Sequence, residues 1–263
     1  MSVVTLRDLN LVVGQGKNEN HILHDVSFTL EAGKITGVAG ASGSGKTQTG
    51  MAIMGLSPAG ARLSGSIDFE GRELVGLSPK AHNALRGTSL AMVFQDPSSA
   101  FHPMLSVGAQ LTDHLRHHRK MGKREALARA VEILAKTRVP DPEGAVKKYP
   151  HQFSGGQLQR IAFASAVICE PRVLIADEPT TALDVTVQAG ILRLLRDLCD
   201  DLELAVLLVT HDFGVLSSVA DTIVVMQNGR VVETGDRHSV IVNPQHDYTR
   251  SLIESLPGTE VAG

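Results

Sequence analysis

Residues 35–48 read Ile35-Thr36-Gly37-Val38-Ala39-Gly40-Ala41-Ser42-Gly43-Ser44-Gly45-Lys46-Thr47-Gln48, which predicts a buried strand, a glycine-rich loop and the start of a helix. The loop from Gly40 to Thr47 fits the pattern G-x-x-x-x-G-K-[ST], known as Walker A. Glycines let backbone N–H groups turn inward, and the following helix points its positive end the same way, so the loop can cradle phosphates. We expect residues 40–48 to bind a nucleoside triphosphate, with Lys46 on the β- and γ-phosphates and the Thr47 hydroxyl on Mg²⁺. A glycine-rich turn that carries Lys-Thr by chance is the alternative, and the flanking strand and helix argue against it.

The composition indicates a soluble α/β protein. The 263 residues suit one large domain or two small lobes with a sizeable core. A net charge of −3 gives no bias toward nucleic acid or an anionic membrane. Apolar runs stay below the ~20 residues of a spanning helix, so at a membrane the chain would dock on another subunit. We expect no signal peptide in the polar residues 1–10, and the widely spaced Cys169 and Cys199 favour a reducing compartment.

Three unbroken apolar runs predict parallel strands that are covered on both faces. They span residues 35–39, 173–176 and 205–210. Each run ends at residues that can do chemistry: the glycine-rich loop, Asp177-Glu178, and His211. Ligands of open α/β sheets bind at the carboxyl ends of the strands, so these residues are expected to meet at one edge.

The remaining pattern predicts an antiparallel β portion and a helical insertion. Residues 3–13 and 26–30 read as strands, and Asn228-Gly229 between two apolar runs predicts a hairpin. The helix that begins at Lys46 is expected to run to about Leu56, before Pro58.

The domain organisation predicted from this pattern is a single domain over residues 1–263. Residues 1–96 and 158–263 are expected to form the core and the β subdomain. Residues 97–157, where apolar side chains fall at helical spacing, are expected to form a helical subdomain.

Further polar motifs stand at the ends of predicted elements. Gln95 follows an apolar strand, and Ser154-Gly155-Gly156-Gln157, after Phe153, opens a helix. Asp177-Glu178 fits the Walker B pattern, in which Asp177 would hold Mg²⁺ through its water shell and Glu178 would polarise the attacking water. Taken singly, Glu178 could cap a helix, Gln95 could be an ordinary polar residue and His211 could be structural.

Together these motifs resemble those of an ATP-binding cassette (ABC) ATPase over essentially the whole chain. They comprise Walker A at 40–47, the Q-loop Gln95, the signature Phe153-Ser154-Gly155-Gly156-Gln157, Walker B at 173–178, the D-loop Ala182-Leu183-Asp184 and the switch His211. The signature carries Phe153 where Leu is commonest. The resemblance implies an α/β fold with a P-loop NTPase core, an antiparallel β subdomain and an inserted α-helical subdomain. It implies ATP and Mg²⁺ as ligands, with Glu178, His211 and Gln95 in catalysis and Thr47, Gln95 and Asp177 near the metal.

The resemblance also implies that two such domains pair head to tail. The signature of one domain would then complete the γ-phosphate site of the other, and Asp184 would shape the interface or cap the next helix. The expected partners are a second related ATPase subunit, two membrane permease subunits and, indirectly, a substrate-binding protein, with no nucleic acid. The expected location is the cytoplasmic face of the bacterial inner membrane.

Three segments are similar to the peptide and nickel importer branch of this family: residues 94–103, 177–188 and 244–252. Gln157-Leu158-Gln159-Arg160, Ser57-Pro58-Ala59-Gly60 and a short tail without a cysteine-bearing extension favour the nickel type slightly, and peptides remain open as cargo. The alternatives are a soluble ABC ATPase that acts on nucleic acid or ribosomes, and a regulatory cassette.

Two further features concern the binding of the base and of metals. Val13 stands where the family usually places an aromatic residue that stacks on adenine, which predicts weaker or less selective base binding. His114, His117 and His118 have a spacing that could bind a metal on a helix, although a solvated basic face is the favoured interpretation.

Overall fold

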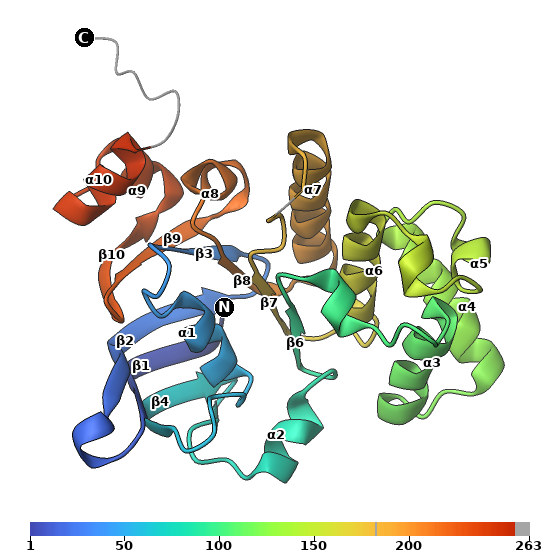
Figure 1. Ribbon diagram of the computed structural model, residues 1–263, viewed down its shortest axis with the longest axis horizontal. Coiled ribbons are helices and arrows are strands. Elements are labelled where there is room, and N and C mark those ends of the chain that lie inside the picture. Colours follow the sequence, from blue (N-terminus) through green and yellow to red (C-terminus); the bar gives the residue numbers. More distant parts are fainter. Residues whose placement is uncertain (182, 256–263) are drawn as a thin grey trace.

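The computed structural model describes residues 1–181 and 183–255, which form two β-sheets and a set of surrounding helices (Figure 1). Its strands are β1 Ser2–Val13, β2 Asn20–Glu31, β3 Ile35–Ala39, β4 Arg62–Phe69, β5 Arg72–Glu73, β6 Leu90–Val93, β7 Val173–Asp177, β8 Ala205–Val209, β9 Thr222–Gln227 and β10 Arg230–Asp236. Its α-helices are α1 Lys46–Ile53, α2 Pro79–Leu85, α3 Val107–His118, α4 Lys123–Lys136, α5 Pro142–Ala145, α6 Gly155–Val167, α7 Val185–Leu202, α8 Phe213–Val219, α9 Arg237–Val242 and α10 Asp247–Glu254. Short 3-10 helices cover Gly16–Asn18, Pro97–Ala100 and Pro150–Gln152.

The larger sheet has six strands in the order β10-β9-β3-β8-β7-β6. All neighbours pair in parallel except β10, which runs antiparallel to β9. The three apolar runs of the sequence are its adjacent strands β3, β8 and β7. Successive side chains of a strand face opposite sides. Accordingly, Leu174 and Ala176 join one hydrophobic cluster, and Val173 and Ile175 join another. Both faces of the sheet are therefore buried, as an unbroken apolar run requires.

The smaller sheet is antiparallel, with four strands in the order β2-β1-β4-β5. Its buried side chains form one hydrophobic cluster with one face of the larger sheet and with α1. Helix α1 contacts β2 on one side and β7 and β8 on the other. This arrangement fixes the beginning of α1 at the carboxyl edge of the larger sheet.

The segment from 97 to 157 is mainly helical and projects to the right of the sheets in Figure 1. It contains α3, α4, α5 and two 3-10 helices, and it ends with the first turn of α6. The boundary that we predict between residues 157 and 158 falls inside α6, because the capping signal at Ser154 begins that helix earlier. The division of the chain into core and helical subdomain stays a prediction.

Helix α1 is shorter than the sequence predicts. It ends at Ile53 rather than near Leu56. Gly55 adopts a positive φ of 63° just after the helix and closes it with a left-handed turn before Pro58 is reached. Helices often end at a glycine in this way, so Gly55 and not Pro58 terminates α1.

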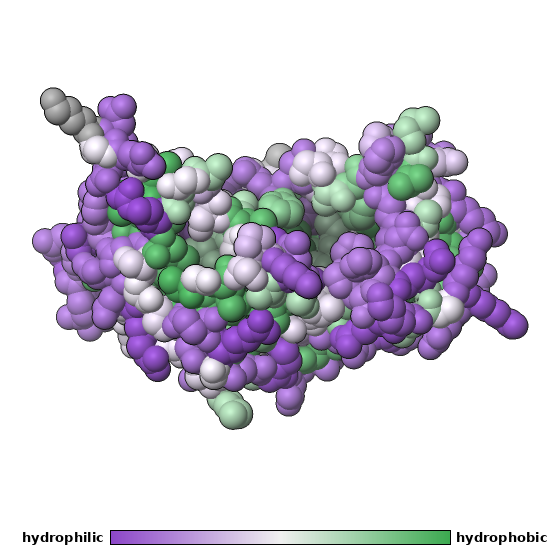
Figure 2. All heavy atoms as spheres, turned by 90° about the horizontal axis from the view of Figure 1, so that it is seen from below, coloured by the Kyte–Doolittle hydropathy of each residue, from purple (hydrophilic) through white to green (hydrophobic). Residues whose placement is uncertain are grey.

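One face of the molecule is hollowed. Figure 2 shows hydrophobic atoms gathered in a hollow near the middle of this face, with hydrophilic atoms around it. A second cavity, of about 280 Å³, is lined by Leu56, by strand β6 and the following Phe94, and by residues of α3 and α6. Leu56 and Phe94 keep 40% and 37% of their surface exposed. Among residues 1–181 and 183–255, no helix is both long and apolar enough to cross a membrane.

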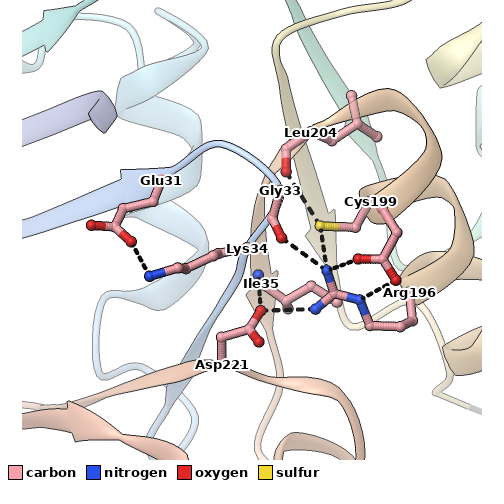
Figure 3. Close-up of polar contacts among 9 residues, drawn as sticks. Glu31, Gly33, Lys34, Ile35, Arg196, Cys199, Leu204 and Asp221 are labelled. Atoms are coloured by element: carbon pink, nitrogen blue, oxygen red, sulfur yellow. Dashed lines mark hydrogen bonds and ion pairs between the residues drawn. The ribbon is translucent and has the colours of Figure 1, made fainter. Parts of the chain in front are cut away.

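Arg196 joins three elements at the amino end of β3 (Figure 3). Its guanidinium donates to the Asp221 carboxylate at 2.8 Å, to the Gly33 carbonyl at 2.9 Å and to Asp200. The same Asp221 oxygen accepts the backbone N–H of Ile35 at 2.8 Å. Nearby, the Cys199 thiol donates to a carbonyl at 3.3 Å, and burial raises its pKa to about 12. The network fastens α7 to the start of β3 and to the residue before β9.

We expect Arg196→Ala to lower the free energy of unfolding by about 1–3 kcal/mol, because it leaves a carboxylate and a carbonyl without their charged donor. Urea unfolding followed by circular dichroism measures the change. Arg193→Ala on the same helix is the matched control, since Arg193 is exposed, and it should change stability by less than about 0.5 kcal/mol. Equal stability of both variants and the wild type would contradict a structural role for the network.

Candidate nucleotide-binding site

A cavity of about 650 Å³ lies beside the glycine-rich loop at the carboxyl edge of the larger sheet. Its lining comes from five parts of the chain: the start of β2, the loop and first turn of α1, the residue Gln95 after β6, the residue Glu178 after β7, and the turn between β9 and β10. The lining residues are Asn20, His21, Ile22, His24, Ser42, Gly43, Ser44, Gly45, Lys46, Thr47, Gln48, Gln95, Glu178, Asn228 and Gly229. The predicted phosphate loop therefore opens onto this cavity.

Lys46 is buried at the base of this cavity, with 6% of its surface exposed. Its Nζ donates to the carbonyls of Gly40 at 2.8 Å and Ala41 at 2.9 Å. Burial lowers the pKa of Lys46, and the charges of Glu178 and Asp177 oppose this shift. Two further polar atoms of the loop region, Ser44 Oγ and Gln48 Oε1, are buried without a hydrogen-bond partner in the described part of the chain. The unpartnered Ser44 hydroxyl, which can donate, and the inward-facing lysine fit a site for an anionic group, whereas the Gln48 oxygen can only accept.

Thr47 and Asp177 meet next to the loop. The Thr47 hydroxyl donates to Asp177 Oδ1 at 3.0 Å. Burial raises the pKa of Asp177, and the bond from Thr47 opposes this shift. In residues 1–181 and 183–255, no group of three or more His, Cys, Asp or Glu side chains could hold a metal ion by itself. One carboxylate and one hydroxyl fit Mg²⁺, which proteins hold with few side chains and with substrate phosphates.

Glu178 is the meeting point of three polar side chains from separate segments. Its carboxylate accepts from Gln95 Nε2 at 3.3 Å and from the Thr181 hydroxyl at 3.0 Å, and lies 3.2 Å from His211 Nδ1. Its backbone has a φ of 45°, in the left-handed region that residues with a side chain rarely adopt. Its N–H donates to the Val209 carbonyl at 2.8 Å, which holds this turn against β8. Strained backbone of this kind gathers at functional sites.

The signature residues lie at the amino end of α6, away from the cavity. Ser154 caps the helix: its hydroxyl accepts from Gln157 N, and the Gln157 side chain accepts from Ser154 N at 3.1 Å. Phe153 packs against the larger hydrophobic cluster. None of residues 153–157 lines the cavity beside the chain's own phosphate loop.

The start of α7 is next to the signature. Asp184 caps α7 by accepting from Val187 N at 2.9 Å. A Cβ added at Gly156 would come within 2.6 Å of the Val187 side chain, which shows how closely the two helix ends approach. Ala182, the first residue of the predicted D-loop, lies outside the described residues.

Several residues of this site are not predicted from the sequence. Thr181 stands within the motif region, but nothing in its pattern names Glu178 as its partner. The Tyr248 hydroxyl of α10 accepts the backbone N–H of Ala41 at 2.9 Å, across 207 residues of chain. His21 and His24 line the cavity although Val13 does not. Only tertiary folding brings these residues to the loop, so no local spacing could have revealed them.

Among the three histidines of α3, the His118 ring contacts both of the others. The His117 and His118 rings meet edge to face at 4.7 Å, and His114 lies 5.7 Å from His118. Burial, with the neighbouring positive charges, lowers the pKa of His114 and His118. Within residues 1–181 and 183–255, neither these histidines nor any other group of three or more His, Cys, Asp or Glu side chains is arranged to hold a metal ion.

Comparison with known proteins gives the same answer along the chain. The pattern of the ABC transporter family matches residues 23–181. The chain is 40% identical over 261 residues to the oligopeptide transport ATP-binding protein OppD of Salmonella typhimurium, covering 99% of this chain and 78% of that protein. It is 45% identical over 240 residues to the dipeptide transport ATP-binding protein DppD of Bacillus subtilis, covering 90% and 72%.

Two solved structures share the architecture. One is the dimeric, post-hydrolysis ATP-binding cassette MJ0796 bound to ADP and Pi, with a TM-score of 0.78, 26% identity and coverage of 89% of this chain and 98% of that chain. The other is cbiO1 from Clostridium perfringens, part of the ABC transporter complex cbiONQ, with a TM-score of 0.79, 28% identity and coverage of 97% and 96%. These likenesses confirm the predicted fold class. The chain belongs to the ABC transporter family and is an ATPase of that family.

Proposed function

We propose that this chain is the ATP-binding and ATP-hydrolysing subunit of a bacterial importer for di- or oligopeptides. One observation carries the catalytic part of the proposal: Gln95, Thr181 and His211 converge on the Glu178 carboxylate at the mouth of the cavity that holds Lys46. The cargo class rests on the relatives named above, whose names specify oligopeptide and dipeptide transport. The nickel alternative stays a prediction, since those names do not support it.

In this proposal the phosphate loop binds ATP through backbone N–H groups of residues 43–48 and through Lys46. Ser44 Oγ, which lacks a partner, can donate its hydrogen to a phosphate oxygen. The positive end of α1 adds to the attraction for the triphosphate. A bound triphosphate also places negative charge beside the buried Lys46 ammonium group, which offsets the cost of burying that positive charge.

Glu178 orients the attacking water, and its three partners hold the carboxylate in place. The His211 side chain is 61% exposed, so it can follow the terminal phosphate. Gln95 comes from the end of β6, which borders the helical segment, and it can report the presence of nucleotide to that segment. Catalysis of phosphoryl transfer depends mainly on such positioning and on charge stabilisation.

Thr47, Asp177 and Gln95 are the residues that we propose to hold Mg²⁺. When bound, the ion would neutralise negative charge on the phosphates. Asp177 contributes a buried carboxylate oxygen that Thr47 already orients at 3.0 Å. The raised pKa of Asp177 means that a cation at this place also stabilises its ionised form.

We propose that the subunit works in a head-to-tail pair with a related ATPase subunit. Residues 153–157 present the amino end of α6 away from the chain's own cavity, where they can contact the γ-phosphate held by the partner. The proposed membrane partners are two permease subunits at the cytoplasmic face of the inner membrane, which receive cargo from a substrate-binding protein. The half-exposed Leu56 and Phe94 line the 280 Å³ cavity and provide an apolar surface on which a permease segment can pack.

Reconstitution in proteoliposomes tests the proposal. The subunit is assembled with its partner ATPase, two permeases and the binding protein, and ATP hydrolysis and uptake of labelled peptide are followed together. Di- or oligopeptides are expected to stimulate both, and a complex that carries Lys46→Ala should do neither. Stimulation by a nickel chelate and not by peptides would overturn the cargo, and hydrolysis that responds to nucleic acid instead would overturn the transport role.

A further inference from the structure

Strand β2 carries two histidines on one side because it contains a bulge. In a regular strand, residues three positions apart face opposite sides. Here Leu11 of β1 pairs with Leu23, and the next residue, Val12, pairs with His21, so that Ile22 is an extra residue in β2. An extra residue shifts the alternation of side chains by one. The His21 and His24 rings accordingly stack, with centroids 5.4 Å apart and planes 17° from parallel.

The stacked pair is fastened to the phosphate loop by backbone. The N–H of His24 donates to the Gly229 carbonyl at 2.8 Å, and the N–H of Gly229 donates to the Ser44 carbonyl at 3.1 Å. Gly229 has a φ of 76°, and a Cβ added there would come within 2.3 Å of the Ile22 carbonyl oxygen. The hairpin turn thus spaces β2 from the loop, and both histidines line the 650 Å³ cavity.

The two rings differ in exposure. His24 is half-buried, and its ring lies beside the turn, since a Cβ at Gly229 would be 3.0 Å from its Cδ2 atom. His21 is exposed and stacks on the outer side of His24. Val13, at the end of β1, pairs with Asn20 and does not line the cavity. The aromatic surface of this cavity therefore comes from β2.

We propose that the base of the bound nucleotide stacks on the His21 ring, with His24 as the positioning residue that supports this ring. The proposal rests on the proposed nucleotide site and deepens it by naming where the base lies. Stacking on an aromatic ring tolerates every base, because each base has a π-face. The platform therefore adds affinity for nucleotides while it discriminates little between ATP and GTP.

Equilibrium titration of the full chain with ATP, GTP and inorganic tripolyphosphate tests the platform. His21→Ala is expected to weaken ATP and GTP binding alike by about tenfold, which equals about 1.4 kcal/mol. His24→Ala should weaken both about threefold, and neither variant should change the affinity for tripolyphosphate, which has no base. His21→Phe keeps an aromatic face and should restore nucleotide affinity. His238→Ala, an exposed histidine of α9 outside the cavity, is the matched control.

Lys46→Ala separates failure of the platform from failure of the site. It is expected to weaken ATP and tripolyphosphate by the same large factor, at least tenfold. If Lys46→Ala does so and His21→Ala binds ATP like the wild type, the platform is wrong and the nucleotide site stands. If His21→Ala weakens tripolyphosphate as much as ATP, the histidine shapes the loop and does not contact the base. If Lys46→Ala changes neither ligand, the proposed nucleotide site itself is wrong.

Discussion

Glu178→Gln is expected to lower ATP turnover by the assembled transporter by about 10²–10³-fold, which corresponds to about 2.7–4 kcal/mol of barrier. The amide has the shape of the carboxylate and can keep the contacts with Thr181 and Gln95. It cannot polarise a water molecule as a carboxylate does, so the loss falls on the chemical step. ATP binding should be unchanged, because the loop and Lys46 are untouched.

Single-turnover phosphate release measures the chemical step, and titration of the isolated subunit measures binding. Glu203→Gln is the matched control: Glu203 also has a left-handed backbone, with a φ of 50°, but it follows α7 far from the cavity lining. The control should hydrolyse ATP at the wild-type rate. Hydrolysis by Glu178→Gln at that same rate would refute the proposed role of this carboxylate.

Gly155→Asp is expected to reduce turnover of the assembled transporter by about 10²-fold while leaving ATP binding to the isolated subunit intact. Gly155 is the first residue of α6, and a Cβ there meets only a Leu183 methyl group, at 3.9 Å. An acidic residue in the first turn also suits the helix dipole, so the fold should tolerate the change. The new carboxylate would repel the γ-phosphate that the partner subunit presents to this helix end.

The control for this variant is Gly122→Asp, at the amino end of α4. Gly122 caps that helix, and a Cβ there meets nothing within 4 Å. It adds the same charge to the same helical segment and should leave turnover unchanged. Loss of ATP binding by the isolated Gly155→Asp subunit would place the signature in its own nucleotide site and contradict the head-to-tail pair.

The fold class and the principal motifs could be predicted because they are written in local patterns. Unbroken apolar runs predict the parallel strands. Ligands of open α/β sheets bind at the carboxyl ends of the strands, so the polar residues at those ends are predicted to form the site. The confirmed family and fold class rest on these same stretches. The assignments of individual site residues stay predictions, although Gln95 and His211 do each lie within hydrogen-bond distance of Glu178.

The features that the sequence did not predict depend on tertiary contacts. The stacking of His21 on His24 requires a bulge whose extra residue is visible only in the pairing of β2 with β1. Thr181 could not be assigned to Glu178 before the turn after β7 was known. Helix α1 ends earlier than Pro58 predicts, because Gly55 closes the helix with a left-handed turn.

The hydrogen bond from the Ala41 N–H to the Tyr248 hydroxyl can form only late in synthesis of the chain. The strand that carries the phosphate loop also takes both of its neighbours, β8 and β9, from late in the chain. A ribosome that adds about 5–20 residues per second needs roughly 10–40 s to travel the 207 residues between the two contact partners. During this interval the loop of the nascent chain lacks β8 and β9 until each has been synthesised, and it lacks its tyrosine until the end. The ability to hold a nucleotide is therefore among the last properties that the growing polypeptide acquires, although the motif responsible is among the first to emerge.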